Sequence, residues 1–374
     1  MRIFLLLLSA LFISNCAMTQ EIIKINISDG DTLTGQLNMP IRKQIPKSLV
    51  VFIHGTGPNT YLNKRIIAGK MINYFDLFSQ EFNKRGIAFF SYNRRGVKLS
   101  DNPPTFDTIL IKQYKKYLPS TEVKDIGFVL KYLRQDKRLK EAKIILLGWS
   151  EGTIIAPLVA LDKKNNVDAV FLAGYVNEKM EDIIRWQNSG GSSMVNFCKY
   201  FDADSNKIIS KSEYESIDPK ISSVRKNIFK ETPFSAFDTN GDSLLTASDF
   251  KKINEKRCDQ ILNAFERGDN EWIWSNYFHV TTEWYKDHKK LEPNKTTLLQ
   301  LSIPILIFQG REDANTPVEG AYDIQKRFQN ASKSNLSCFF FESHDHDLNY
   351  LSWPIKGVIS PGLKKIFDTA EELF

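Results

Sequence analysis

The stretch that decides the fold is KIILLGWSEG, residues 143–152. An apolar run leads into a Gly-x-Ser-x-Gly pentapeptide, and a helical stretch, residues 153–161, follows it. In such a strand-turn-helix unit a strained backbone lifts the serine above the sheet edge, and flanking glycines let strand and helix approach closely. Ser150 is therefore a candidate nucleophile, although five residues of this kind also fit an ordinary strand-to-helix turn.

A second strand and loop lie upstream of this turn. Residues 49–53 are uniformly apolar, as in a buried parallel strand, and run into HGTGP, residues 54–58. Backbone amides near Thr56 or Gly57, together with the amide of Glu151, are candidates to hold the negative oxygen of a tetrahedral intermediate. Each such donor is worth roughly 3 kcal/mol of barrier.

A candidate acid lies downstream. The apolar residues 303–308 predict a strand that opens into QGREDANTP, residues 309–317. Asp313 stands three residues after Gly310 and just before a Thr-Pro helix start, a spacing that turns its carboxylate back toward the site. Glu312 is the rival acid, and a plain surface loop is the alternative for the acidic pair.

Three histidines compete for the role of general base. A predicted strand, residues 336–341, is followed by ESHDHDL, which contains His344 and His346. One of these two must accept the serine proton if a triad exists. His54 ends a strand on the other side of Ser150 in the sequence, so we expect it to shape its loop instead.

With these motifs in this order, the chain resembles the serine α/β-hydrolases, in particular bacterial acyl hydrolases of the dienelactone-hydrolase-like and acylaminoacyl-peptidase-like kind. The resemblance also includes FFSYNRRG, residues 89–96, with Ser100, and covers roughly residues 30–175 and 300–374. It implies an α/β-hydrolase fold, which is a mostly parallel, doubly wound sheet with an inserted, mainly helical cap.

The resemblance also implies a triad of Ser150, Asp313 and His346. It favours His346 as base because that histidine precedes a helix-starting apolar residue, and His344 remains the alternative. The chain departs from the family at Asn93, where Asp is commoner and forms a salt bridge. With Asn at position 93, Arg95 is the candidate to pair with a loop carboxylate.

Length and charge agree with a hydrolase that carries an insertion. A chain of 374 residues with 42% hydrophobic content exceeds the needs of one doubly wound domain. We expect the core in residues 20–175 and 302–374, with a cap in residues 176–301. The net charge of +6 is spread along the chain, without an arginine-rich run interleaved with aromatics, so we expect no nucleic-acid partner. No phosphate-binding loop or other motif predicts an organic cofactor.

The first residues read as an export signal, residues 1–19. Arg2 precedes an apolar stretch, residues 3–13, that is too short to span a bilayer but fits a signal-peptide core. Cleavage before Cys16 would anchor the chain through a lipid, whereas cleavage within residues 17–20 would not. We therefore expect an exported protein, either periplasmic, secreted or a membrane-anchored lipoprotein. An oxidising compartment would permit a disulfide between Cys198 and Cys258, yet three mature cysteines indicate no disulfide framework.

The cap contains two acidic loops 36 residues apart that resemble a pair of EF-hands. Each has oxygen-bearing side chains at loop positions 1, 3, 5, 9 and 12, a backbone ligand at position 7 and an apolar residue at position 8. The expected ligands are Asp202, Asp204, Asn206, Ile208, Ser210 and Glu213 in the first loop, and Asp238, Asn240, Asp242, Leu244, Thr246 and Asp249 in the second.

These loops predict a structural Ca²⁺ in the cap, with Mg²⁺ as the alternative. Lys207 and Ser243 stand where EF-hands favour glycine, and Asp249 is a shorter twelfth ligand than Glu. The competing interpretation is a pair of surface turns rich in Asp and Asn. Most of the nearby aromatic residues are expected to pack the cap against the body, with one or two as candidates to line an apolar acyl or aromatic subsite, and these are Trp272, Trp274, Tyr277, Phe278, Trp284 and Tyr285.

The sequence leaves two classes of function. The first is an exported serine hydrolase that cleaves carboxylic esters of a small or acylated substrate through an acyl-enzyme on Ser150. Peptides or thioesters are alternative substrates, but no propeller-like repeat array precedes the catalytic region to control peptide entry. The second class is a calcium-dependent adhesion module on an inactive hydrolase frame. A nucleophile, acid and base in the right order favour the enzyme.

Overall fold

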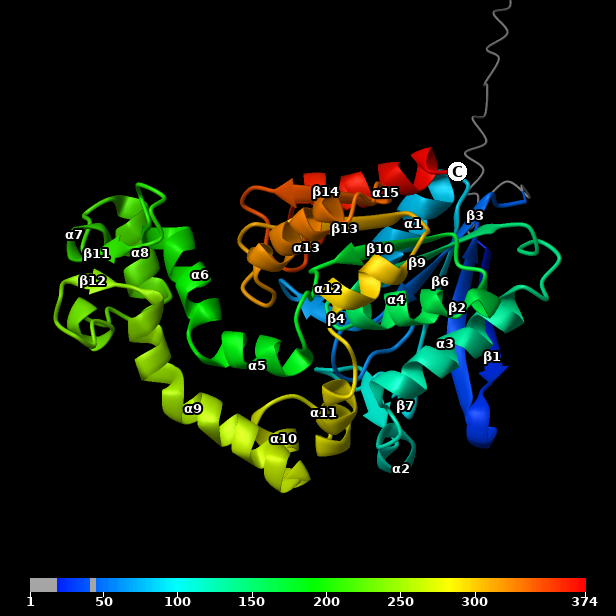
Figure 1. Ribbon diagram of the computed structural model, residues 1–374, viewed down its shortest axis with the longest axis horizontal. Helices are drawn as coiled ribbons and strands as arrows, with labels where there is room; N and C mark the ends of the chain where they lie inside the picture. The colour runs from blue at the N-terminus through cyan, green and yellow to red at the C-terminus, as the bar shows by residue number, and fades with distance from the viewer. Residues whose placement is uncertain (1–18, 41–44) are drawn as a thin grey trace, which may run out of the picture.

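The computed structural model describes residues 19–40 and 45–374 (Figure 1). The expected signal peptide, with its candidate lipid attachment site at Cys16, lies outside the described residues except for Thr19. No helix in these two ranges combines the length and the apolar character needed to cross a membrane.

An eight-stranded sheet forms the centre of the molecule, in the order β1-β2-β6-β3-β9-β10-β13-β14. From β6 to β14 all neighbouring strands are parallel, whereas β1 and β2 pair antiparallel with each other and β2 pairs antiparallel with β6. The strands are β1 (Thr19–Asn26), β2 (Thr32–Met39), β3 (Ser48–Ile53), β6 (Ala88–Tyr92), β9 (Lys143–Trp149), β10 (Ala169–Ala173), β13 (Ile305–Gly310) and β14 (Leu336–Phe341).

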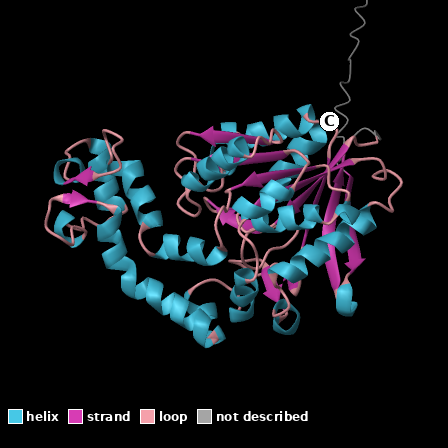
Figure 2. Ribbon diagram, in the orientation of Figure 1, coloured by secondary structure: helices cyan, strands magenta, loops and turns pink. Residues whose placement is uncertain are grey.

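Helices cover both faces of this sheet (Figure 2). Strand β3 shows why, because successive side chains point to opposite faces and each meets an apolar layer. Leu49 and Val51 pack with α3 (Pro119–Leu133), α4 (Gly152–Leu161) and α13 (Val318–Asn330) on one face. Val50 and Phe52 pack with α1 (Phe75–Lys84) and α15 (Pro361–Glu372) on the other. The predicted fold class, a mostly parallel doubly wound sheet, is confirmed.

The segment between β10 and β13 is mainly helical and projects from the sheet (Figures 1 and 2). Its elements are α5 (Met180–Asn188), α6 (Gly191–Phe201), β11 (Ile209–Ser210), α7 (Lys211–Tyr214), α8 (Pro219–Asn227), η3 (Phe234–Ala236), β12 (Leu244–Leu245), α9 (Ala247–Arg267), α10 (Asn270–Asn276), α11 (Thr282–Lys289), α12 (Asn294–Thr297) and η4 (Leu298–Gln300).

This segment has two parts with separate apolar clusters. Near the sheet, Trp284 and Tyr285 are buried with Tyr117 and Ile154 of the body, and Trp272, Trp274 and Tyr277 pack around them. Phe278 is exposed instead. The distal part, residues 190–250, encloses its own small cluster around Phe197 and Phe250. We call it the distal lobe, and α9 runs from it back toward α10 and α11 (Figure 1).

The remaining described elements are short. They are β4 (Lys64–Ile67), β5 (Lys70–Asn73), β7 (Val97–Leu99), β8 (Asp107–Ile109), α2 (Ile111–Tyr114), α14 (Ser352–Lys356), η1 (Ser28–Gly30) and η2 (Lys163–Asn165). Cys198, Cys258 and Cys338 are free thiols, so the structure does not contain the disulfide that the sequence would permit between the first two.

Candidate active site

Ser150 sits on the sharp turn between β9 and α4. Its φ of 54° lies in the left-handed region that side chains other than glycine rarely adopt. The turn is tight because a Cβ added at Gly148 would lie 2.2 Å from the carbonyl oxygen of Gly152, and one added at Gly152 would lie 2.2 Å from that of Ile53. Two glycines are therefore required for β9, α4 and β3 to meet at the serine.

Asp313 and His346 form an ion pair across two loops. The Nδ1 of His346 lies 2.9 Å from Oδ2 and 3.0 Å from Oδ1 of Asp313, whose side chain is buried. The same carboxylate accepts hydrogen bonds from the amide and hydroxyl of Thr316 and from Nε2 of Gln309, at 2.7 to 2.9 Å. These bonds fix the carboxylate toward the imidazole.

The electrostatics of this pair favour a charged imidazole. Burial lowers the pKa of His346, but the charge and hydrogen bond of Asp313 outweigh burial and raise that pKa to about 9. The pKa of Asp313 is lowered, because burial is outweighed by the charge and hydrogen bond of His346. The absence of a side chain at Gly174 leaves room for the imidazole of His346, since a Cβ there would lie 2.5 Å from Cε1 of that ring.

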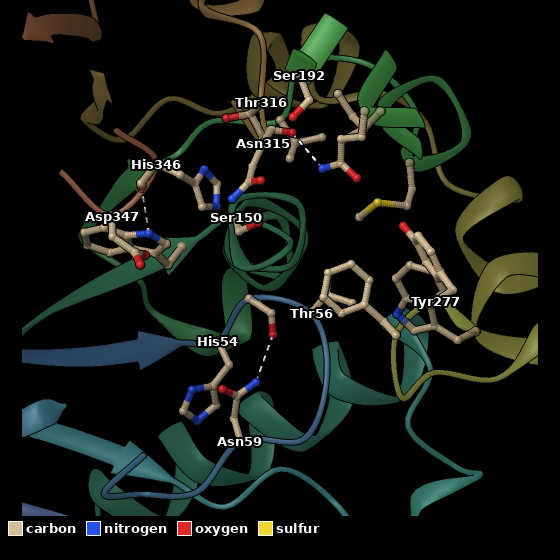
Figure 3. Close-up of a pocket in the computed structure, with 18 of the residues that line it drawn as sticks. His54, Thr56, Asn59, Ser150, Ser192, Tyr277, Asn315, Thr316, His346 and Asp347 are labelled. Carbon is tan, nitrogen blue, oxygen red and sulfur yellow. Dashed lines mark hydrogen bonds between the residues drawn. The ribbon is translucent and has the colours of Figure 1, made fainter. Parts of the chain in front are cut away.

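Ser150 and His346 line one cavity of about 470 Å³. Figure 3 shows the imidazole beside the serine, with Asn315 and Thr316 on the same side of the cavity and Thr56 on the opposite side. The structure thus brings the predicted nucleophile and base to one cavity and the predicted acid behind the base.

The rival residues occupy other positions. His344 is buried outside this cavity, with Nδ1 2.6 Å from the carbonyl oxygen of Glu342 and Nε2 accepting from the amide of Gly362. His54 lines the cavity, but its Nε2 lies 2.7 Å from the carbonyl oxygen of Tyr92. Burial and the charge of Arg94 lower the pKa of His54 to about 3, so it stays neutral. Glu312 pairs with Lys199 at 3.1 Å.

The predicted oxyanion donors have free amides. Across residues 19–40 and 45–374, the backbone N–H groups of Thr56, Gly57 and Glu151 have no hydrogen-bond acceptor. Thr56 itself lines the cavity, whereas Gly57 and Glu151 are not among its lining residues. Arg94 secures the upstream loop by donating from Nη1 to the carbonyl oxygens of Gly55 (2.7 Å) and Gly57 (2.6 Å).

The cavity walls combine aromatic and amide side chains. The aromatic residues Phe52, Tyr74, Trp149, Tyr277, Phe278 and Trp284 share the walls with amide and hydroxyl residues that include Asn59, Asn63, Gln187, Asn188, Ser192 and Asn276. Several come from the segment between β10 and β13, so that segment contributes to the walls around Ser150. Such a cavity suits a small organic molecule with both apolar and hydrogen-bonding groups.

Sequence reasoning missed a buried charge cluster beneath the serine. Arg94 pairs with Glu122 at 3.0 Å, and its Nη2 lies 4.0 Å from Glu151. Burial and the charge of Glu151, opposed by Arg94, raise the pKa of Glu122 to about 7. The Arg94-Arg95 pair was visible in the sequence. The acidic partners Glu122 and Glu151 lie about 30 to 60 residues further along the chain, and a local sequence pattern does not show which distant residues become neighbours.

The departure at Asn93 has a structural counterpart. The Oδ1 of Asn93 accepts the amide N–H of Tyr61 at 2.8 Å, so its side chain ties two loops by a neutral bond. Arg95 reaches one loop carboxylate, Asp31 at 2.7 Å, and it also pairs at 2.6 Å with Asp125 of α3.

The two acidic loops differ in how they arrange their carboxylates. In the first loop, side-chain oxygens of Asp202, Asp204 and Glu213 all lie within 4.8 Å of one another. In the described residues no such three-carboxylate group forms in the second loop. The carboxylate at position 12 is held alike in both loops: Glu213 accepts from the amides of Ala203 and Ser210, and Asp249 accepts from those of Thr239 and Thr246.

The loop backbones share one geometry. Lys207 and Ser243, at position 6 of the two loops, both have positive φ, 62° and 66°. The loops pair through an antiparallel bridge in which Ile209 faces Leu245, the apolar residues at position 8. The remaining expected side-chain ligands stay exposed or half-buried, and these are Asn206, Ser210, Asp238, Asn240, Asp242 and Thr246. Among the described residues, the first loop is the one that brings three carboxylates together.

Comparison with known proteins identifies the architecture. No protein-family model and no curated protein sequence matches the chain. Among solved structures, Est1E from Butyrivibrio proteoclasticus aligns with a TM-score of 0.50 and 11% identity, over 94% of this chain and 96% of that one. An esterase of Pyrococcus furiosus (TM-score 0.49, 11% identity, 96% and 91% covered) and the α/β-hydrolase GrgF from Penicillium sp. sh18 (0.49, 13%, 95% and 100%) are also similar. The likeness to Est1E, at 11% identity, concerns the fold alone, and together with the sheet order and the nucleophile turn it shows that the chain has the α/β-hydrolase fold.

Proposed function

We propose that this protein is a serine hydrolase that cleaves carboxylic esters through an acyl-enzyme on Ser150. The observation that carries the proposal is the strained turn of Ser150 facing the same cavity as His346, whose other ring nitrogen is bonded to buried Asp313. These three groups have the roles of nucleophile, base and orienting acid, which are recognised by geometry.

In the proposed reaction, Nε2 of His346 removes the proton from Oγ of Ser150 as that oxygen attacks the ester carbonyl carbon. The carbonyl oxygen becomes an oxyanion, which the amides of Thr56 or Gly57 and of Glu151 hold. The imidazolium then gives its proton to the departing alcohol as the C–O bond breaks. Water, deprotonated by the same imidazole, releases the acid and restores Ser150.

Export of this hydrolase is part of the proposal and rests on residues 1–19. The products would then form outside the cytoplasm, or at a membrane surface if Cys16 carries a lipid. A panel of matched oxygen esters, thioesters and aminoacyl amides separates the ester hydrolase from the thioesterase and peptidase alternatives.

Replacing the nucleophile gives the first prediction. Ser150→Ala should abolish covalent labelling by a fluorophosphonate and lower ester hydrolysis by about 10⁴-fold or more, because the hydroxyl forms the covalent bond. Ser192→Ala is the matched control, since Ser192 lines the same cavity. It should label normally. Labelling of folded Ser150→Ala protein, or hydrolysis near the wild-type rate, would contradict the serine mechanism.

The two downstream histidines should respond differently. His346→Ala should lower kcat by several orders of magnitude, because the base is lost. His344→Ala should mainly lower the melting temperature, since the nitrogens of His344 contact the backbone of Glu342 and Gly362. Steady-state kinetics and thermal unfolding of both variants test this. The opposite ranking of kcat would move the base to His344.

The pH dependence follows from the raised pKa of His346. A general base works only when deprotonated, so kcat/KM should rise with pH and level off above about pH 9, the value to which Asp313 raises the pKa. Asp313→Asn should shift this rise to lower pH, because burial alone lowers the histidine pKa, and should also reduce the plateau. The pH profile for a neutral ester measures both effects. An unmoved rise in Asp313→Asn would show that another group titrates.

We also propose that the distal lobe binds Ca²⁺ as a structural ion, in the first loop before the second. The convergence of Asp202, Asp204 and Glu213 supports this, because oxygen ligands of this kind suit Ca²⁺ and unneutralised carboxylates repel one another. A bound ion would stabilise a lobe whose apolar cluster is small.

Chelation tests the ion. Removing divalent cations should lower the melting temperature, and Ca²⁺ should restore it, because an ion that binds the folded state stabilises that state. Asp202→Ala/Asp238→Ala should lose the heat of Ca²⁺ binding in titration calorimetry. Glu215→Gln, an exposed carboxylate outside the loops, should keep it. No Ca²⁺ or Mg²⁺ heat in the parent would leave the loops as surface turns.

A further inference from the structure

The side chain of Glu151 is held by the segment that projects from the sheet. Its Oε1 accepts hydrogen bonds from Nε1 of Trp284 at 2.7 Å and from Nε2 of His288 at 2.8 Å. Both donors belong to α11, and the hydroxyl of Tyr117 from the body donates to Oε2. A carboxylate directly after the nucleophile is thus bonded to an element more than 130 residues away.

This contact is fully buried. Glu151 is 0% exposed, and Trp284 and His288 are 1% and 2% exposed. Their spacing of four residues puts both donors on one face of α11, where the two rings meet edge to face with centroids 4.6 Å apart. Burial raises the pKa of Glu151, but the hydrogen bond from His288 and the charge of Arg94 lower it to about 2, so the carboxylate is ionised.

Fixing this carboxylate also fixes the backbone of the same residue. The N–H of Glu151 has no acceptor within the described chain and is the expected downstream oxyanion donor. An oxyanion donor acts only when it points at the developing charge, and displacements of about 1 Å can cost about 100-fold in rate. Side-chain bonds that hold Glu151 from three directions therefore restrain the peptide that donates.

We propose that α11 positions the oxyanion donor through Glu151, with His288 and Trp284 as positioning residues. The projecting segment would then serve catalysis through Glu151, besides forming cavity walls. The inference rests on the proposed function, because it assigns Glu151 a part in the same hydrolysis. The inference also accounts for a buried carboxylate at position 151, because an uncharged residue would suffice there if the side chain served packing alone.

A matched pair of variants tests the hydrogen bond. His288→Gln keeps an N–H that can reach Glu151, whereas His288→Met has similar length and no donor. His288 does not line the cavity of Ser150, so substrate contacts stay unchanged. We expect His288→Met to lower kcat about tenfold or more with KM within about twofold, and His288→Gln to recover kcat to within about threefold. The rate of phosphonylation by a fluorophosphonate should follow kcat. The P=O oxygen of the reagent gains negative charge as Ser150 attacks phosphorus, and it uses the same donors.

Asp287→Ala is the control for simple loosening of α11. The carboxylate of Asp287 accepts the amide N–H of Ser120 at 2.9 Å, so it attaches the same helix to the body without touching Glu151. It should lower the melting temperature while kcat stays near the wild-type value. Equal kcat for His288→Gln and His288→Met, or a loss in Asp287→Ala as large as that in His288→Met, would overturn the inference. Either result in an enzyme whose wild type labels at Ser150 leaves the proposed function intact, whereas failure of wild-type labelling removes the function itself.

Discussion

The close approach of three backbone segments at Ser150 is the constraint on which the site depends. Strand β9 must turn sharply into α4 while β3 passes alongside, and only glycine at positions 148 and 152 leaves room for this. The left-handed conformation of Ser150 costs of order 1 to 3 kcal/mol, which the surrounding core must offset. The parallel strands on either side are buried throughout, so the strain is held by a rigid frame.

Buried charge connects this frame to its surroundings. Arg94 holds the carbonyl groups of the upstream loop, pairs with Glu122, and lies 4.0 Å from Glu151, which α11 holds in turn. Arg94 faces two carboxylates, and all three side chains are buried, so the charge of each is stabilised mainly by its partners in the cluster and by hydrogen bonds. Removing Arg94 would leave both carboxylates without this cationic partner under the nucleophile. Both halves of the candidate oxyanion hole therefore depend on one electrostatic cluster.

The two parts of the projecting segment have different physical roles. Near the sheet, Trp284 and Tyr285 bury their rings against the body, and this part shapes the cavity. The distal lobe is joined to the rest through α5 and α9, and its small apolar cluster includes Ile209 and Leu245, which pair the two acidic loops. Ion pairs from Lys199 to Glu312 and from Lys207 to Glu319 cross from the lobe to the segment that carries Asp313. The pair of Lys207 and Glu319 is exposed and contributes little, whereas that of Lys199 and Glu312 is half-buried.

The sequence by itself determined the elements whose signals are local. Apolar runs predicted β3, β9 and β13, because a central parallel strand is buried on both faces, and the glycine spacing predicted the turn at Ser150. The run that predicted β14 forms an edge of the sheet, where its residues are half-buried or exposed. It also placed Asp313 and His346 at the ends of strands that meet at one sheet edge. Only the tertiary structure decided whether His346 or His344 reaches the cavity. Both are histidines of the same loop, and the direction of each side chain is set by the folded backbone. The same holds for Glu151, whose partners Trp284 and His288 are distant in the chain and become its neighbours only when α11 packs on the body.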